Sequence, residues 1–200
     1  MRKVDKEFGK DWWFKVWGPD KLTANGMGKS ADWILKAGDK WHGFGNLAAG
    51  FNLLDPIKCT LITPGLDMSG RFAKTGIPAS IVTKFLAEHG VVVEKTGLYS
   101  FFIMFTIGIT KGRWNTLLTA LQQFKDDYDR NAPMWRILPE FCAAHPRYER
   151  MGLRDLCQSI HDLYAQGDIA RLTTEMYLSD LQPAMAPSEA YAHIAHRKTE

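Results

Sequence analysis

Apolar residues along the middle of the chain follow strand-like and helical spacings in turn. The stretch from Ile57 to Thr63 mixes β-branched and apolar residues and is followed by Pro64-Gly65, a pattern typical of a strand that ends in a turn. From Pro78 to His89 the apolar positions recur at helical spacing, with proline in the first turn and Gly90 as the stop signal. The pattern therefore predicts a strand followed by a helix.

Two further strands and a second helix are predicted next. Val91 to Val93 reads as a strand, and Tyr99 to Ile109 is apolar for long enough to predict a central strand buried on both faces. Trp114 to Asp129 carries one apolar helical stripe. The resulting βαββα order predicts an α/β (α+β) fold, a small split βαβ sandwich whose helices cover one face of a mixed or antiparallel sheet.

The flanking regions differ in character and suggest three segments. Residues 1–55 are loop-rich and aromatic, with a short strand near Trp13–Trp17; residues 56–132 hold the βαββα domain, and residues 133–200 form a helical extension. In the extension we expect a helix over Leu153–Gln166, with Leu163 among its inward residues, and a last helix over Ser188–Arg197.

Composition and charge narrow the function classes. The chain has 200 residues with a formal net charge of +3, and its basic and acidic residues are interspersed, so neither nucleic acid nor a membrane is an expected partner. Its 3 cysteines lie far apart without metal-ligand spacing, and the longest apolar run is too short to span a bilayer. We expect a cytoplasmic protein without a metal site.

Motif searching finds no catalytic residue. Gly28-Lys29-Ser30 resembles the end of a phosphate-binding loop but lacks the earlier glycine, and His193 and His196 are better explained by an exposed helix face than by a metal. His161 is more simply interpreted as a structural histidine than as a base.

Glu94 is the ionisable residue that stands out. It follows Val91-Val92-Val93 and precedes Lys95-Thr96-Gly97, so its carboxylate is placed beside a turn, where it could meet a cationic ligand. From the pattern alone, a solvent-facing Glu94 paired with Lys95 is the more economical interpretation.

A series of motifs is spread over nearly the whole chain: Trp12-Trp13-Phe14, Trp41-His42-Gly43-Phe44, Leu54-Asp55-Pro56, Thr63-Pro64-Gly65, Gly76-Ile77-Pro78-Ala79, Glu88-His89-Gly90, Glu94-Lys95-Thr96-Gly97, Ile107-Gly108-Ile109, Leu138-Pro139-Glu140 and Pro187-Ser188-Glu189-Ala190-Tyr191. In identity and order these motifs resemble those of the major family of bacterial ornithine, lysine and arginine decarboxylases.

The resemblance implies an enzyme of fold type I that uses pyridoxal phosphate, in which the cofactor ring accepts the electrons left when carbon dioxide departs. In the family the Schiff-base lysine lies in a Ser-x-His-Lys motif, which this sequence lacks. We therefore expect the chain to be a C-terminal portion of such an enzyme, with Met1 an internal methionine of a longer reading frame, no cofactor-binding residue of its own, and no activity in isolation.

The resemblance also assigns a role to Glu94, because this glutamate in Glu-Lys-Thr-Gly is expected near the distal ammonium of a lysine or ornithine substrate. Thr96 is the second expected substrate-binding residue. Lysine or ornithine is favoured over arginine, the product is a diamine, and proton consumption would link the reaction to acid tolerance. A homodimer or higher homo-oligomer is the expected assembly.

An alternative from another class is a non-catalytic ligand-binding or oligomerisation module built on the same sandwich. The tryptophan-rich segment of residues 12–41 is expected to be exposed when neighbouring domains are absent.

Overall fold

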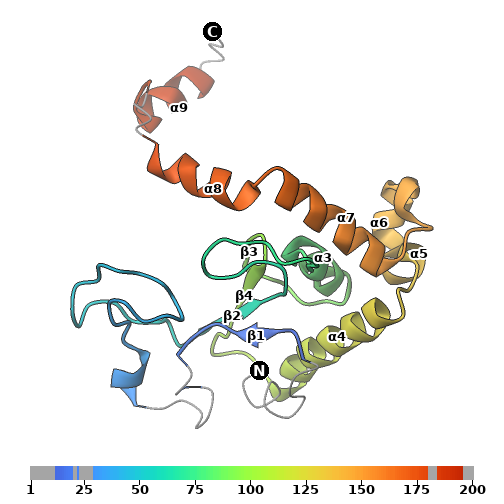
Figure 1. Ribbon diagram of the computed structural model, residues 1–200, viewed down its shortest axis with the longest axis horizontal. Helices are drawn as coiled ribbons and strands as arrows, with labels where there is room; N and C mark the ends of the chain where they lie inside the picture. Colours follow the sequence, from blue (N-terminus) through green and yellow to red (C-terminus); the bar gives the residue numbers. More distant parts are fainter. Residues whose placement is uncertain (1–11, 20–21, 23–28, 180–183, 196–200) are drawn as a thin grey trace. The chain divides into compact units, whose positions relative to one another are not determined.

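The computed structural model describes residues 12–19, 22, 29–179 and 184–195. The chain forms two compact units, Met1–Gly167 and Asp168–Glu200. In chain order, with the labels of Figure 1, the first unit contains β1 (Lys15–Val16), the 3₁₀ turn Ser30–Trp33, β2 (Lys58–Ile62), α3 (Ala79–Glu88), β3 (Lys95–Thr96), β4 (Ser100–Met104), α4 (Lys111–Asp129), α5 (Met134–Ile137), α6 (Pro139–Ala144), the 3₁₀ turn Pro146–Tyr148 and α7 (Leu153–Gln166).

The sheet is antiparallel throughout, with strand order β1-β2-β4-β3. Since β2 and β3 both pair antiparallel with β4, they run parallel to each other with β4 between them, and α3 connects them. This is a split βαβ arrangement, and the predicted fold class is confirmed.

One apolar layer joins the sheet to α3 and α4. Alternate residues of β4 are buried, and helical stripes of α3 and α4 meet them. The central members are Leu61, Phe101 and Ile103 from the sheet, Val82, Phe85 and Leu86 from α3, and Leu117, Leu121 and Phe124 from α4. The predicted helices around Pro78–His89 and Trp114–Asp129 are confirmed.

The prediction of a strand over Val91–Val93 is wrong. Gly90 adopts a φ of 75°, and the Val91 amide donates back to the Leu86 carbonyl, so this stretch completes the end of α3. Pairing with β4 is fully established only at Lys95–Thr96, which is β3. The three valines therefore precede β3 and are not part of it.

The strand predicted over Tyr99–Ile109 is shorter than expected, since β4 ends at Met104. Only Phe101 and Ile103 are buried within it, so the strand is buried on one face and not on both. The length of an apolar run overstated the strand because Thr106–Gly108 forms a turn that exposes Ile107.

Helix α7 has the predicted bounds of Leu153–Gln166, but one predicted inward residue is exposed. Leu163 faces solvent, while Leu153, Leu156, Cys157 and His161 are buried. Asn131 fixes the start of the helix from a distance, because its side-chain oxygen accepts hydrogen bonds from the amides of Arg154 and Asp155.

The aromatic N-terminal segment belongs to the core, contrary to the expectation that it is exposed. Trp12 and Phe14 are buried against the sheet layer, and Phe14 contacts Phe124 edge to face. Trp33 is also buried, whereas the exposed aromatics of this region are Phe44 and Phe51.

The second unit contains α8 (Ile169–Leu178) and α9 (Pro187–Ala195). Helix α9 agrees with the predicted last helix as far as Ala195; the remainder of that prediction lies outside the described residues. None of the described residues of α8 is buried. The division into two units does not test the predicted segment boundaries at residues 55/56 and 132/133, which stay predictions.

Candidate functional site

A loop of residues 64–76 connects β2 to α3 and is held tightly at its base. The Thr63 hydroxyl donates to the Ile77 carbonyl over 2.6 Å, and the Ile77 amide donates to the Pro64 carbonyl. Gly65 has a φ of 134°, and a Cβ there would overlap the Tyr99 ring. The Thr63-Pro64-Gly65 sequence therefore suits a backbone that passes directly over a buried aromatic ring.

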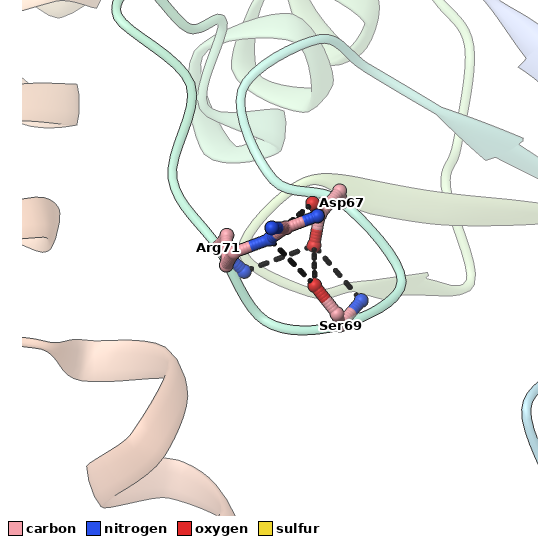
Figure 2. Close-up of polar contacts among 3 residues, drawn as sticks. All are labelled: Asp67, Ser69 and Arg71. Carbon is pink, nitrogen blue, oxygen red and sulfur yellow. Dashed lines mark hydrogen bonds and ion pairs between the residues drawn. The ribbon is translucent and has the colours of Figure 1, made fainter.

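The tip of this loop is organised around one carboxylate. Figure 2 shows Asp67 accepting hydrogen bonds from the Ser69 amide and hydroxyl and from the Arg71 amide and guanidinium. The Ser69 hydroxyl, followed by the Arg71 amide, holds the pKa of the Asp67 carboxyl well below its usual range. Asp67 is therefore charged at neutral pH and fixes Arg71 in an exposed position.

The loop is also bonded to α7 through His161. The His161 Nε2 lies 2.8 Å from the Ala73 carbonyl, which can only accept, so Nε2 carries a proton. Nδ1 lies 2.6 Å from the Tyr99 hydroxyl and, in the neutral ring, accepts its proton. Burial, the main cause, raises the pKa of the Tyr99 phenol above its ordinary value. Both ring nitrogens are satisfied, which confirms the prediction of a structural histidine.

Of the two predicted substrate-binding residues, Thr96 lies in the edge strand β3 and Glu94 immediately precedes it. Glu94 is exposed, and its amide donates to the Phe102 carbonyl, while the Thr96 hydroxyl donates to that of Thr83 on α3 over 3.2 Å. No ion pair joins Glu94 to Lys95 in the described part of the chain. The structure thus presents the Glu94 carboxylate at an open edge of the sheet.

Sequence reasoning missed the Asp67 cluster and the Tyr99–His161 pair. Asp67-x-Ser69 carries a local turn signal, since aspartate commonly accepts from the amide two residues on, so that cluster could have been found. Tyr99 and His161 are 62 residues apart, and nothing local in either sequence announces their contact.

The remaining candidate motifs contribute no site. Within the described residues no group of three or more histidine, cysteine, aspartate or glutamate side chains could hold a metal. His193 is exposed on α9, whereas His196 and Gly28 lie outside the described residues. In the same part of the chain no helix is long and apolar enough to cross a membrane.

The described residues do not fit a pyridoxal phosphate site. The cofactor requires a lysine at the bottom of a pocket, yet nearly all described lysines are exposed. The exception, Lys125, is partly buried but lies 2.6 Å from Asp129 and over the Trp13 ring. No lysine lines the cavities that the described residues form at Phe85/Asp127, at Val91/Trp114 and at Leu66/Arg71.

The chain belongs to the Orn/Lys/Arg decarboxylase family, because residues 1–113 match its major domain. Lysine decarboxylase LdcA of Pseudomonas aeruginosa is 47% identical over 95% of this chain and 25% of its own length. The biodegradative arginine decarboxylase of Escherichia coli is 31% identical over 100% of this chain and 29% of its own. The chain thus spans about a quarter of the length of these relatives.

The fold agrees with the family assignment. The structure of lysine decarboxylase A from Pseudomonas aeruginosa superimposes with a TM-score of 0.87 at 45% identity, covering 100% of this chain and 27% of that one. The split βαβ sheet, its helices and the aromatic segment therefore correspond to one region of that lysine decarboxylase structure.

Proposed function

We propose that this chain forms the substrate-positioning part of a cytoplasmic, pyridoxal-phosphate-dependent carboxy-lyase that converts a basic amino acid into a diamine and carbon dioxide. Lysine or ornithine is the preferred substrate. The observation that carries the proposal is the exposed carboxylate of Glu94 at the edge strand β3, on a chain that is 47% identical to a lysine decarboxylase.

The chemistry of Glu94 suits a distal ammonium. A carboxylate that another part of the enzyme covers would lose water and would need an opposite charge, which the side-chain ammonium of lysine or ornithine supplies. Thr96 lies two residues after Glu94, and its hydroxyl is hydrogen-bonded to that of Thr83. We include it as the second substrate-binding residue of this edge. A carboxylate also pairs with a guanidinium, so the preference for lysine or ornithine over arginine rests in this proposal on the resemblance of Glu94-Lys95-Thr96-Gly97 to the lysine- and ornithine-type members of the family.

The cofactor and the Schiff-base lysine belong, in this proposal, to a part of the enzyme outside these 200 residues. The poor fit of the described lysines to such a site supports that view. Cys142 and Cys157 are buried free thiols, which suits a reducing compartment.

Assembly into a homodimer or larger homo-oligomer is part of the proposal. An open groove of about 510 Å³ is lined by apolar residues including Val91, Phe105 and Trp114, and Val92 at its rim is almost fully exposed. Apolar surface of this kind is usually covered by a protein partner.

The proposal is tested by a chimera in which residues 12–195 replace the matching region of lysine decarboxylase LdcA. Diamine release from lysine, ornithine and arginine is measured, with the isolated 200-residue chain plus pyridoxal phosphate as the comparison. We expect the chimera to decarboxylate lysine or ornithine faster than arginine and the isolated chain to release no diamine. A folded, cofactor-loaded chimera without activity, or turnover by the isolated chain, would contradict the proposal.

A further inference from the structure

A second cavity, on the helical side of the first unit, is unrelated to the β3 edge. It has a volume of about 400 Å³ and lies between α3, α4 and α5. Its lining includes His89, which follows the end of α3, Thr116, Thr119, Gln123 and Asp127 from α4, and Arg136 from α5. Three helices therefore bring polar groups to one concave surface beside the apolar core.

Asp127 is the unusual member of this lining. It is only 6% exposed, and its carboxylate accepts a side-chain hydrogen bond from the Gln123 amide over 2.9 Å. No lysine, arginine or histidine nitrogen forms an ion pair with it in the described parts of the chain. A buried carboxylate without a cation is costly, because its charge loses hydration without electrostatic compensation.

The preceding residue provides an internal comparison. Asp126 accepts a hydrogen bond from Gln122 over 3.0 Å, the same glutamine–aspartate spacing on the same helix, but it does not line the cavity. Only Asp127 thus combines burial with access to a space that a ligand could fill. One carboxylate is too few ligands for a divalent metal ion, whereas a single ammonium group matches it.

We propose that the cavity between α3, α4 and α5 is a binding site for a small organic ammonium compound, whose cation pairs with Asp127. The hydroxyl groups of Thr116 and Thr119 can accept the remaining ammonium protons. Arg136 at the rim gives the site a cationic side, which would take the carboxylate of an amino acid but finds no partner in a diamine.

The ammonium can come from two sources, an amino acid or its decarboxylated amine, and binding measurements separate them. The 200-residue chain is titrated by calorimetry with lysine, with 1,5-diaminopentane and, as an uncharged probe of equal length, 1,5-pentanediol. We expect both ammonium compounds to bind and the diol not to bind. The inference does not rest on the proposed function, since binding requires neither cofactor nor turnover.

Variants locate the bound cation. Asp127→Asn retains the shape of the side chain and one oxygen that can accept from Gln123 but removes the charge, and it should weaken binding of both ammonium compounds at least tenfold. Asp126→Asn is the matched control and should leave their affinities unchanged. Arg136→Gln should weaken lysine alone if the carboxylate is bound at the rim, and this result would identify the amino acid as the better-fitting ligand.

A cavity-filling variant protects the test against misfolding. Thr119→Phe changes an exposed wall of the cavity and no buried polar group, so it should abolish binding while circular dichroism remains unchanged. No binding by the folded wild-type chain, or equal affinities of the wild type, Asp127→Asn and Thr119→Phe, would overturn the inference. Loss of binding on Glu94→Gln instead would move the ligand to β3 and overturn it as well.

Discussion

The layer between the sheet and helices α3 and α4 differs from the clamp that holds loop 64–76, although both are buried. The layer is apolar, and its members sit at strand and helix periodicities. The clamp depends on Tyr99, His161 and the close approach of two glycines. Apolar contacts tolerate small displacements, whereas hydrogen bonds and glycine contacts require fixed geometry. The candidate edge strand β3 lies shortly before Tyr99 in the sequence, so the clamp adjoins the candidate site.

The largest effect is expected in the apolar layer. Phe124 is fully buried and packs edge to face against Phe14 and Phe85. Phe124→Ala should lower the free energy of unfolding by about 3–5 kcal/mol, because it leaves a cavity between the sheet and two helices. Urea denaturation measures the change. Leu163→Ala, at an exposed position of α7, should stay within about 0.5 kcal/mol of wild type.

The stability of the clamp should fall when a single methyl group is added, whereas the apolar layer loses stability when a side chain is removed. A Cβ at Gly76 would overlap the His161 ring, so Gly76→Ala must displace that ring from Tyr99. We expect a loss of about 1–3 kcal/mol in the free energy of unfolding. Gly112→Ala has room for its methyl group and should be neutral or slightly stabilising. Equal stabilities of the two variants would show that loop 64–76 is not clamped.

A smaller effect on the free energy of unfolding, which depends on pH, is expected from Cys157, a buried member of the apolar layer. Burial raises the pKa of the Cys157 thiol to about 12, whereas an unfolded thiol titrates near ~8.5. The folded state therefore keeps this proton more strongly, and its contribution to stability is complete below pH ~8.5 and is lost as the pH rises toward the folded value.

At pH ~9.5 the expected loss is about 1 kcal/mol from this group. Cys157→Ala should make the fall of unfolding free energy between pH 8 and 9.5 shallower than in wild type, as followed by urea denaturation at each pH. Parallel pH profiles of the two proteins would show that Cys157 does not differ between the folded and unfolded states.

The apolar layer could be predicted from the sequence, while the clamp and much of the candidate site could not. Helical stripes gave α3, α4 and α7 because periodic burial is a local property of the chain. The strand prediction at Val91–Val93 was wrong because the Val91 amide bonds back to the Leu86 carbonyl at the end of α3, and the residue types alone do not reveal this contact. Contacts across long separations, such as that of Tyr99 with His161, have no local pattern at all.

Glu94 is an intermediate case, because its position could be predicted from the sequence pattern but its role could not. Its position on the rim of a strand could be anticipated, and its exposure agrees with the pattern, yet the role of its carboxylate comes from the resemblance to decarboxylases. The sequence pattern gave no indication of Asp127, because the burial of one aspartate in an amphipathic helix depends on how α5 packs beside it.

The central claim, that this chain supplies the carboxylate that selects the substrate, is tested most directly by Glu94→Gln in the LdcA chimera. Steady-state kinetics with lysine are compared with those of Glu149→Gln, a glutamate placed outside the site. The account predicts that Glu94→Gln lowers kcat/KM for lysine at least a hundredfold, chiefly through KM, with the cofactor spectrum intact, and that Glu149→Gln has no effect. Unchanged kcat/KM in a cofactor-loaded Glu94→Gln chimera would contradict it.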